Sequence, residues 1–325
     1  MRRFAKTAGL LSLALALSLA GAELFVRALY HDLTTTSPIE SWFGLRWQRE
    51  QLRFNARGYR DREVPAYKPP GRRRMIVIGD SFTVAMGIAE EDRFPNRIER
   101  ALRGSGADWE VFQFARLGHE FHHHVNTLQT QALPANPDFV LLQWYVNDFE
   151  ISKQGRERPR PPISDPSLHN FLYRHSAFYT LLTHGWFVLQ VRLGLSQDYA
   201  AYFRENFGDP RGERSLRAMD QLGRFFALAK IAGVPVGMVL FPNLEVGIGN
   251  DDYPFGFLHD RVLAACARHG VTCVDLRKVF VERGADVSAL RLNRFDHHAS
   301  AFAHALAADA LMQTFAEEWQ HRAGP

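Results

Sequence analysis

The sequence predicts an α/β protein in which helices cover both faces of a parallel β-sheet. Five short segments are continuously apolar, and amphipathic segments of helical length separate them. Strands that are apolar at every position are typical of a sheet that is buried on both faces. Because a helical connection returns the chain to the same edge of the sheet, successive strands are expected to be parallel. The expected fold is a flavodoxin-like three-layer α/β/α sandwich around a five-stranded parallel sheet.

The strands are expected at residues 75–78, 111–114, 139–144, 234–240 and 272–276. The helices between and after them are expected at residues 94–102, 125–133, 216–232, 257–268 and 301–319. Gly233 and Gly270 follow the third and fourth of these helices, where a glycine commonly ends a helix. This alternation predicts one large domain over residues 72–325.

The amino-terminal residues 1–27 are expected to reach a membrane. Residues 7–22 carry no charge and follow Arg2, Arg3 and Lys6. As a helix they span ~24 Å, and continuation through residues 24–26 would approach the ~30 Å hydrocarbon core. An uncleaved anchor is favoured, and a signal peptide removed after Ala20-Gly21-Ala22 is the alternative. The leading cations place the start of the chain in the cytoplasm and the rest outside, on the periplasmic side of the inner membrane in a bacterium. After signal cleavage the protein would instead be periplasmic or secreted.

Two further segments interrupt the strand and helix pattern. Residues 28–71 have no sustained period and end in a proline-rich run, which predicts a stalk or linker. A helical insert is expected at about residues 150–215. Its apolar stripe is expected to pack on the core, with a lid or wall over a binding site as the alternative. The stripe consists of Phe171, Leu172, Phe178, Leu181, Leu182 and Trp186.

Composition excludes several classes of protein. A chain of 325 residues with 46% hydrophobic and 23% charged residues is neither disordered nor a coiled coil. The net charge is only +4 and no basic stripe is present, so nucleic acid is not an expected partner. Cys266 and Cys273 are too few for a cysteine-rich zinc site. We expect them to be free and buried, with a disulfide in an oxidising compartment as the alternative.

Two short motifs carry side chains suited to nucleophilic catalysis. The first strand runs directly into Gly79-Asp80-Ser81, which puts a serine hydroxyl at the carboxyl end of a parallel strand. Asp296-His297-His298 precedes the last helix and offers a carboxylate and an imidazole. A serine nucleophile needs a neutral imidazole to take its proton, and the imidazole needs a carboxylate to orient it. Beside the serine, Asp80 is expected to bond within the turn rather than act as an acid.

Four blocks over residues 72–318 resemble the SGNH (GDSL-type) hydrolases. Gly79-Asp80-Ser81-Phe82-Thr83 resembles the first block, and the family then implies that Ser81 is the nucleophile. The stretches at residues 111–118 and 145–148 are similar to the second and third blocks. They imply that the Gly118 N–H and the Asn147 amide join the Ser81 N–H in an oxyanion hole. The last block implies that His298 is the base and Asp296 its orienting acid.

The chain departs from the family pattern in three places. Tyr145 stands where the third block usually begins with glycine, which narrows the space beside the oxyanion site. Gln113 replaces a common asparagine in the second block. Asp296 and His298 are two positions apart, where many members have three. Candidates to line the pocket are Phe82, His119, Tyr145 and His297.

A histidine cluster follows Gly118. His119 and His123 are spaced to bind zinc from one helix face, but no acid or cysteine stands at the usual motif spacing. An exposed or helix-starting polar run is therefore favoured for His119, His122, His123 and His124, with a pocket-lining role as the alternative. We expect no metal and no organic cofactor.

The resemblance implies a serine esterase that hydrolyses an O-acyl ester, such as an O-acetyl ester, with a Ser-His-Asp triad, and the amino-terminal segment predicts that it acts outside the cytoplasm. Two alternatives stay open. One is an O-acyltransferase that uses the same triad to modify an exported or surface polysaccharide. The other is a non-catalytic, glycan-binding envelope protein. The expected partners are an ester or O-acylated carbohydrate and the membrane, and the sequence indicates neither the substrate nor the oligomeric state.

Overall fold

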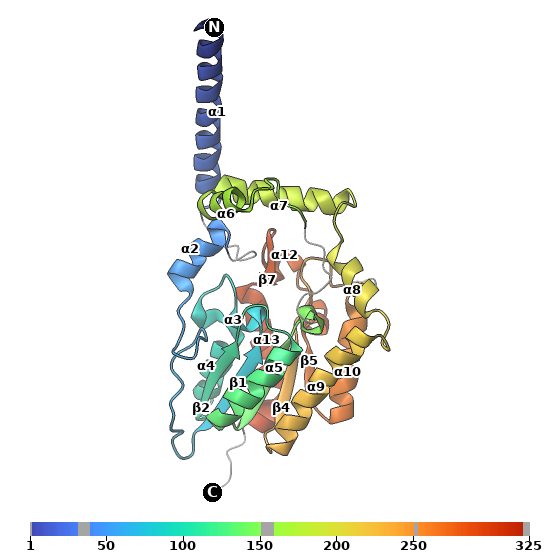
Figure 1. Cartoon of the computed structure of the whole chain (residues 1–325). Coiled ribbons are helices and arrows are strands. Elements are labelled where there is room, and N and C mark those ends of the chain that lie inside the picture. Colours follow the sequence, from blue (N-terminus) through green and yellow to red (C-terminus); the bar gives the residue numbers. More distant parts are fainter. Residues whose placement is uncertain (1, 32–39, 151–158, 250–252, 321–325) are drawn as a thin grey trace. The chain divides into compact units, whose positions relative to one another are not determined.

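The computed structural model describes residues 2–31, 40–150, 159–249 and 253–320 (Figure 1). Its contacts divide the chain into two compact units. The first unit combines Met1–Glu50 with Glu157–Gln197, and the second combines Gln51–Arg156 with Asp198–Pro325.

The second unit is built on a five-stranded parallel sheet with the order β2-β1-β3-β4-β5. The strands are β1 (Arg73–Gly79), β2 (Trp109–Ala115), β3 (Phe139–Trp144), β4 (Val236–Leu240) and β5 (Thr272–Asp275). Every residue of β2 and β3 is buried, as a sheet covered on both faces requires. The predicted fold class is confirmed.

Helices cover both faces of this sheet. The crossover from β1 to β2 runs in the opposite direction to those from β2 to β3, β3 to β4 and β4 to β5. Because such crossovers are right-handed, α4 lies on one face and α5, α9 and α10 lie on the other. The helix α13 follows β5 and packs against α4, while α5 and α10 pack against α9. These helices are α4 (Phe94–Gly104), α5 (Phe121–Thr127), α9 (Glu213–Ile231), α10 (Gly256–His269) and α13 (Ala301–Thr314).

Shorter elements complete the second unit. The turns and short helices after β1, β2 and β3 are α3 (Ser81–Val84), η1 (Glu90–Asp92), η2 (Leu128–Ala132), η3 (Leu133–Ala135) and η4 (Val146–Phe149). Beyond the insert lie α8 (Tyr199–Phe207), α11 (Leu276–Glu282), α12 (Val287–Leu290) and α14 (Ala316–Gln320). A two-stranded antiparallel sheet of β6 (Arg291–Asn293) and β7 (Asp296–Ala299) precedes α13.

The segment before β1 belongs to the second unit from Gln51 on. Arg60 is fully buried in this unit. Its guanidinium donates to three carbonyl groups at and after the end of α3, those of Val84, Ala85 and Ile88. The ring of Tyr59 stacks on Phe114 of β2, with the centroids 4.7 Å apart. The part of the predicted stalk from Gln51 on is therefore packed into the second unit. The sequence does not reveal this packing, because it depends on one buried cation and one ring rather than on a periodic apolar pattern.

The first unit joins the amino-terminal helix to part of the insert. Its helices are α1 (Arg2–Leu29), α2 (Trp42–Gln51), α6 (Pro166–His175) and α7 (Ala177–Arg192). Residues Phe4–Leu29 are long and apolar enough to cross a membrane, with a mean hydropathy of 1.9 in their most apolar window, and only 6% of that window is buried. A small apolar core holds α1, α2 and α7 together through Val26, Phe43 and Ala177.

The predicted insert divides between the two units. Helices α6 and α7 pack against each other, and α7 packs against α1, whereas α8 belongs to the second unit. Phe178 and Leu181 pack against the small core, as expected. Phe171, Leu182 and Trp186 are 59%, 48% and 39% exposed, so the expectation that they pack on the core is wrong.

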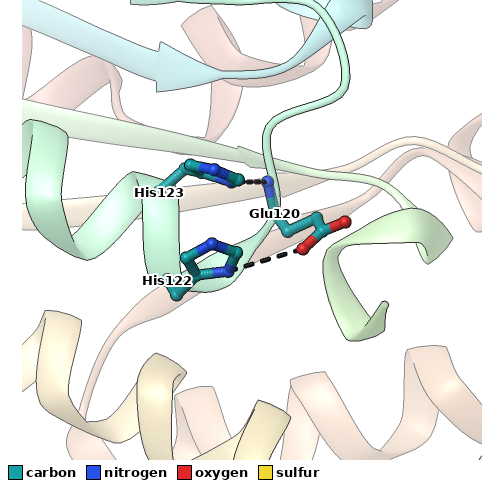
Figure 2. Close-up of side chains that lie close together, drawn as sticks. All are labelled: Glu120, His122 and His123. Atoms are coloured by element: carbon teal, nitrogen blue, oxygen red, sulfur yellow. Dashed lines mark hydrogen bonds and ion pairs between the residues drawn. The ribbon is translucent and has the colours of Figure 1, made fainter. Parts of the chain in front are cut away.

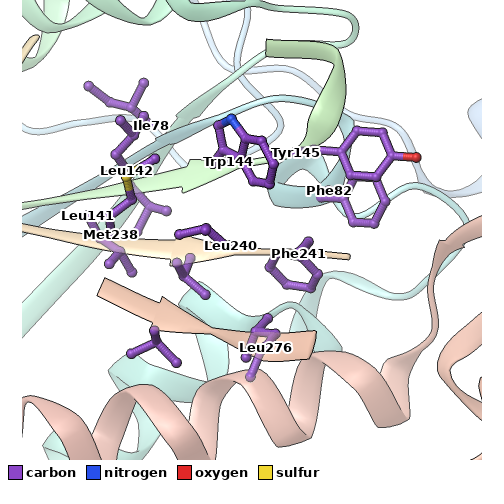
Figure 3. Packing of buried hydrophobic residues seen from close by; sticks show 14 of the residues in the cluster. Ile78, Phe82, Leu141, Leu142, Trp144, Tyr145, Met238, Leu240, Phe241 and Leu276 are labelled. Atoms are coloured by element: carbon purple, nitrogen blue, oxygen red, sulfur yellow. The ribbon is translucent and has the colours of Figure 1, made fainter. Parts of the chain in front are cut away.

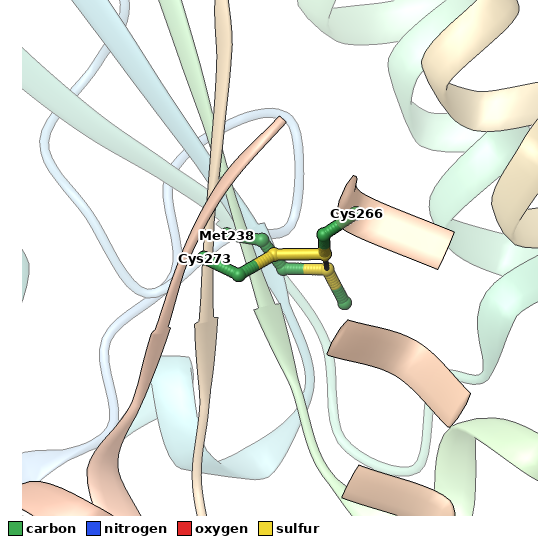
Figure 4. Close-up of a disulfide and its surroundings, with 3 residues drawn as sticks. All are labelled: Met238, Cys266 and Cys273. Atoms are coloured by element: carbon green, nitrogen blue, oxygen red, sulfur yellow. Dashed lines mark hydrogen bonds between the residues drawn. A yellow bond between two sulfur atoms is a disulfide. The ribbon is translucent and has the colours of Figure 1, made fainter. Parts of the chain in front are cut away.

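The two cysteines form a disulfide, so the expectation of free cysteines is wrong. Cys266 lies in the last turns of α10 and Cys273 on β5, and their Cα atoms are 6.4 Å apart (Figure 4). Gly270 between them adopts a φ of 66°, which ends the helix and returns the chain beside it. The tight turn brings the two side chains within the range that a disulfide can bridge.

The apolar core of the second unit continues to the carboxyl ends of the strands. Ile78, Leu142 and Leu240 fill its centre, and aromatic rings follow them toward the strand ends (Figure 3). The ring of Phe82 stacks on Tyr145, with 4.3 Å between centroids, and lies 5.3 Å from that of Phe241. The loops that follow β1, β3 and β4 are thus fixed to one another by packed rings.

Candidate active site

Ser81 lies in a turn fixed by its neighbour. The strand β1 ends at Gly79, and Asp80 then caps α3, with Oδ1 accepting a hydrogen bond from the Phe82 N–H at 2.9 Å. Asp80 is fully buried, which confirms a structural place for its carboxyl group within the turn. Ser81 is the first residue of α3, so its hydroxyl stands at the carboxyl edge of a central strand.

A side chain from the neighbouring strand secures the same turn. Oε1 of Gln143 on β3 accepts from the Asp80 N–H at 3.0 Å and from the Thr83 hydroxyl at 2.8 Å. A β-carbon at position 79 would lie 2.2 Å from Oγ1 of Thr83. Gly79 is therefore required because the cross-strand hydrogen bonds occupy the space of a side chain. Sequence reasoning missed Gln143 because it lies inside an apolar strand.

The proposed acid and base lie on one short strand. Nε2 of His298 is 2.9 Å from Oγ of Ser81, and Nδ1 of His298 is 2.6 Å from Oδ1 of Asp296. Both residues belong to β7, where side chains two positions apart point to the same face. The two-residue spacing therefore suits a strand, and it brings acid, base and hydroxyl into one continuous chain of contacts.

The charges around His298 favour its protonated form. Burial lowers the pKa of His298, but the Asp296 carboxylate, its hydrogen bond and the charge of Asp80 raise it above its ordinary value of 6.5 on balance. Burial, followed by the nearby Asp148, raises the pKa of Asp80 to about 6. Asp296 is thus the main influence that offsets burial and makes His298 a stronger base.

The three proposed oxyanion donors follow β1, β2 and β3. Among the described residues, the N–H groups of Ser81 and Gly118 donate no hydrogen bond. Gly118 adopts a φ of 67°, in the left-handed region that favours glycine. The side-chain amide of Asn147 makes one long contact, 3.5 Å to the carbonyl of His119. All three donors therefore remain able to bond a developing oxyanion.

The four candidate pocket residues separate into two kinds. Phe82 and Tyr145 are buried, 1% and 4% exposed, and pack against each other. The Tyr145 hydroxyl accepts from the amide of Asn243 at 2.8 Å, so the ring is anchored on a loop after β4. His119 and His297 are only partly buried. Of the four side chains, only these two imidazoles have exposed surface that a ligand could contact.

His122, His123 and His124 lie in the first turns of α5, so the expectation of a helix-starting run is confirmed. His124 is fully buried and not exposed, and its Nε2 lies 2.8 Å from Oδ1 of Asp148. Burial lowers the pKa of His124 to about 4 and raises the pKa of Asp148. The pair interacts electrostatically with Asp80 of the nucleophile turn. Sequence reasoning missed it because its members are 24 residues apart, on different elements.

Glu120, His122 and His123 gather at the start of α5 (Figure 2). One ligand atom from each lies within 4.8 Å of the others. Nδ1 of His123 accepts from the Glu120 N–H at 3.2 Å, and the Glu120 side chain caps the helix in return. These groups therefore have a structural use in capping α5, and we assign no metal to them.

A separate hollow lies away from these residues. It is lined by Phe226, Lys230, Val236, Arg268 and Gly270, among others, at the amino ends of β4 and β5. Ser81 follows the carboxyl end of β1, so this hollow is at the opposite edge of the sheet.

Neither a protein-family description nor a curated protein matches the chain. Among solved structures it is similar to the acetyl xylan esterase AlAXEase, at 15% identity and a TM-score of 0.47, with 74% of this chain and 98% of that chain covered. It is also similar to TesA, at 12% identity and a TM-score of 0.48, with 75% and 98% covered. A third is a lipolytic protein of the G-D-S-L family from Veillonella parvula, at 12% identity and a TM-score of 0.47, with 75% and 99% covered. Such identities do not by themselves carry an activity from those proteins to this one.

Proposed function

We propose that this chain is a membrane-anchored, extracytoplasmic serine esterase of the SGNH (GDSL) type. The observation that carries the proposal is the chain of contacts from Asp296 through His298 to Ser81, with distances of 2.6 and 2.9 Å. Both ring nitrogens of His298 are thereby assigned, one to the acid and one to the hydroxyl. A packing role alone does not require a serine, an imidazole and a carboxylate in this order.

The geometry suits acyl transfer through a covalent intermediate. Oγ of Ser81 forms a bond to the ester carbonyl carbon while its proton moves to Nε2 of His298. The oxygen that becomes negative is met by the Ser81 and Gly118 N–H groups and the Asn147 amide, and one such donor contributes about 3 kcal/mol. His298 then returns the proton to the leaving alcohol. Water then attacks the carbonyl carbon of the acyl-serine while His298 takes its proton, and this step releases the acid and restores Ser81.

Two features support a location outside the cytoplasm. The helix α1 carries a membrane-length apolar segment preceded by cations, which favours translocation of the chain beyond α1. The Cys266–Cys273 disulfide suits an oxidising compartment such as the periplasm. Retention of α1 makes the protein a single-pass membrane protein.

The proposal is tested with the full chain in detergent micelles. Wild type, Ser81→Ala and a matched control, Ser105→Ala, are assayed with p-nitrophenyl acetate, butyrate and octanoate, and treated with a fluorophosphonate probe before intact-mass measurement. Ser105 is exposed at the end of α4, and its hydroxyl has no part in the proposed triad. We expect labelling and turnover in the wild type and in Ser105→Ala, and neither in Ser81→Ala.

Other outcomes distinguish the alternatives. A folded wild type that neither labels nor hydrolyses any of the three esters contradicts the proposal and favours a glycan-binding protein. If the wild type labels but releases acid slowly, added sugar acceptors decide between water and an acceptor hydroxyl. Acylated sugar in the product mass spectrum would then assign the chain as an acyltransferase with the same triad.

A further inference from the structure

Near its start α7 packs apolar side chains on the small core, but further along it buries polar side chains and exposes apolar ones. Thr180, Thr183 and Gln190 are buried, at 5%, 0% and 5% exposure. The amide of Gln190 both donates to the carbonyl and accepts from the N–H of Arg160, at 2.8 and 3.1 Å. A helix that packs on a protein in water normally has the opposite polarity. The buried Gln190 amide is thus satisfied by hydrogen bonds within the unit, while the exposed apolar side chains of α7 are left to another environment.

The exposed face of α7 forms a continuous apolar stripe. Leu182, Trp186, Leu189 and Leu193 recur at the spacing of one helix face and are 48%, 39%, 43% and 62% exposed. The indole N–H of Trp186 donates to the Arg160 carbonyl at 3.0 Å, so the polar edge of this ring is satisfied while its apolar surface is exposed. We call these four residues the α7 stripe.

The neighbouring segments extend the same character. Leu168 and Phe171 of α6 are 47% and 59% exposed, and Leu195 after α7 is 67% exposed. Arg174 and Arg192 stand exposed in the last turns of α6 and α7. Apolar surface with cations at its edges is typical of helices that lie on an anionic lipid surface.

The start of α7 is joined to α1 near the end of the apolar span. Glu23 of α1 accepts from the Ser176 hydroxyl at 2.6 Å and from the N–H groups of Ala177 and Phe178 at 2.9 and 3.0 Å. Figure 1 shows α7 running across the end of α1 within this unit. Leu24 and Phe25, which follow the acid, are 69% and 65% exposed. The exposed apolar surfaces of α1 and α7 therefore adjoin at Glu23.

We propose that α6 and α7 lie on the bilayer that α1 crosses, with the α7 stripe at the boundary between headgroups and acyl chains. The lipid is favoured over a second protein because the stripe adjoins the apolar surface of α1, which lipid already covers in a membrane protein. Trp186 fits this boundary, where indole rings are enriched. The inference rests on the membrane location proposed for α1 and not on the esterase activity, so it can fail while Ser81 labelling succeeds.

Fluorescence quenching of variants with one introduced cysteine tests this placement. The native cysteines are bonded to each other, so a maleimide dye reaches only an introduced cysteine. Full-length Leu182→Cys and Leu189→Cys are labelled with the dye NBD and placed in nanodiscs of phosphatidylethanolamine and phosphatidylglycerol. The matched control is Ile231→Cys at the end of α9, an apolar position that is 83% exposed in the second unit.

We expect lipids with a nitroxide near the headgroup to quench the dye at 182 and 189, and iodide in the buffer to have little effect there. The dye at 231 should show the reverse. If iodide quenches 182 and 189 as strongly as 231, the stripe lies in water and the proposal is overturned. Protection of both positions from iodide and from nitroxide lipid would also overturn it, because a protein surface would then cover the stripe.

Discussion

The side chain of Gln143 occupies the space that any residue larger than glycine would need at position 79. A β-carbon on Gly79 would lie 2.4 Å from Oε1 of Gln143 and 2.2 Å from Oγ1 of Thr83. The same oxygen of Gln143 accepts from the Asp80 N–H. The nucleophile turn and the central strand are therefore held together by one amide group.

Gly79→Ala is expected to destabilise the protein by about 1–3 kcal/mol, because the added methyl group must displace the Gln143 contacts. Esterase activity should also fall in the fraction of the variant that remains folded, since Ser81 moves with the turn. Thermal unfolding and turnover of the full chain measure the two effects. Gly104→Ala is the control, because a β-carbon there meets nothing within 4 Å. Equal stability of the two variants would contradict the assigned role of Gln143.

Activity is expected to rise with pH through a midpoint above 6.5. Burial lowers the pKa of His298, but Asp296 and Asp80 raise it above that ordinary value. Only the neutral imidazole can take the Ser81 proton, so kcat/KM is low below the raised pKa and full above it. A pH profile of kcat/KM on p-nitrophenyl acetate measures the midpoint.

Asp296→Asn is expected to lower kcat by about 10⁴-fold and to move the midpoint to lower pH. Loss of the carboxylate removes the main influence that raises the pKa of His298 and also leaves its tautomer unfixed. The pH profile of this variant is compared with that of the wild type. An unchanged midpoint would show that Asp296 does not raise the pKa of His298.

Asn147→Ala is expected to lower kcat by about 10²- to 10³-fold with little change in KM. The amide would act on the oxyanion of the transition state more than on the bound ester. Asn126→Ala is the control, because Asn126 is exposed on α5 and its side chain has no assigned role. A loss confined to KM would exclude an oxyanion role for Asn147.

Reduction of the Cys266–Cys273 disulfide is expected to cost about 2 kcal/mol, since the bridge closes a loop of only a few residues. Thermal unfolding with and without reductant measures this cost, and Cys266→Ser with Cys273→Ser gives the matched protein without a bridge. In protein isolated from its own compartment, alkylation without reductant should leave the mass unchanged. Free thiols in that sample would contradict the proposed oxidising location.

The sequence predicted those features that local patterns determine. Continuous apolar strands predicted the sheet, and the motifs around Ser81 and His298 predicted two segments that the fold then brings within 2.9 Å. Contacts between distant elements were not predictable, as Gln143 and the His124–Asp148 pair illustrate. The exposure of the apolar stripe on the later part of α7 was also not predictable, because an apolar stripe has the same period whether it faces a core or a lipid. The side that such a stripe faces depends on the polar partners of the opposite side, and Arg160 precedes α7 by more than a helical turn.

Three of the hydrogen bonds that Glu23 accepts come from groups 153 to 155 residues away. During synthesis α1 is complete long before Ser176 is made, so its acid first meets the membrane without these donors. A carboxylate at the end of an apolar span is costly in that state and favours a shallow position of the helix. Arg27 lies one helical turn away on α1 and can pair with the carboxylate from the start, whereas the three donors of the insert reach it only after the insert is translated. We therefore expect the membrane helix to reach its final depth only after translation has passed the insert, which makes its placement a late step in biogenesis.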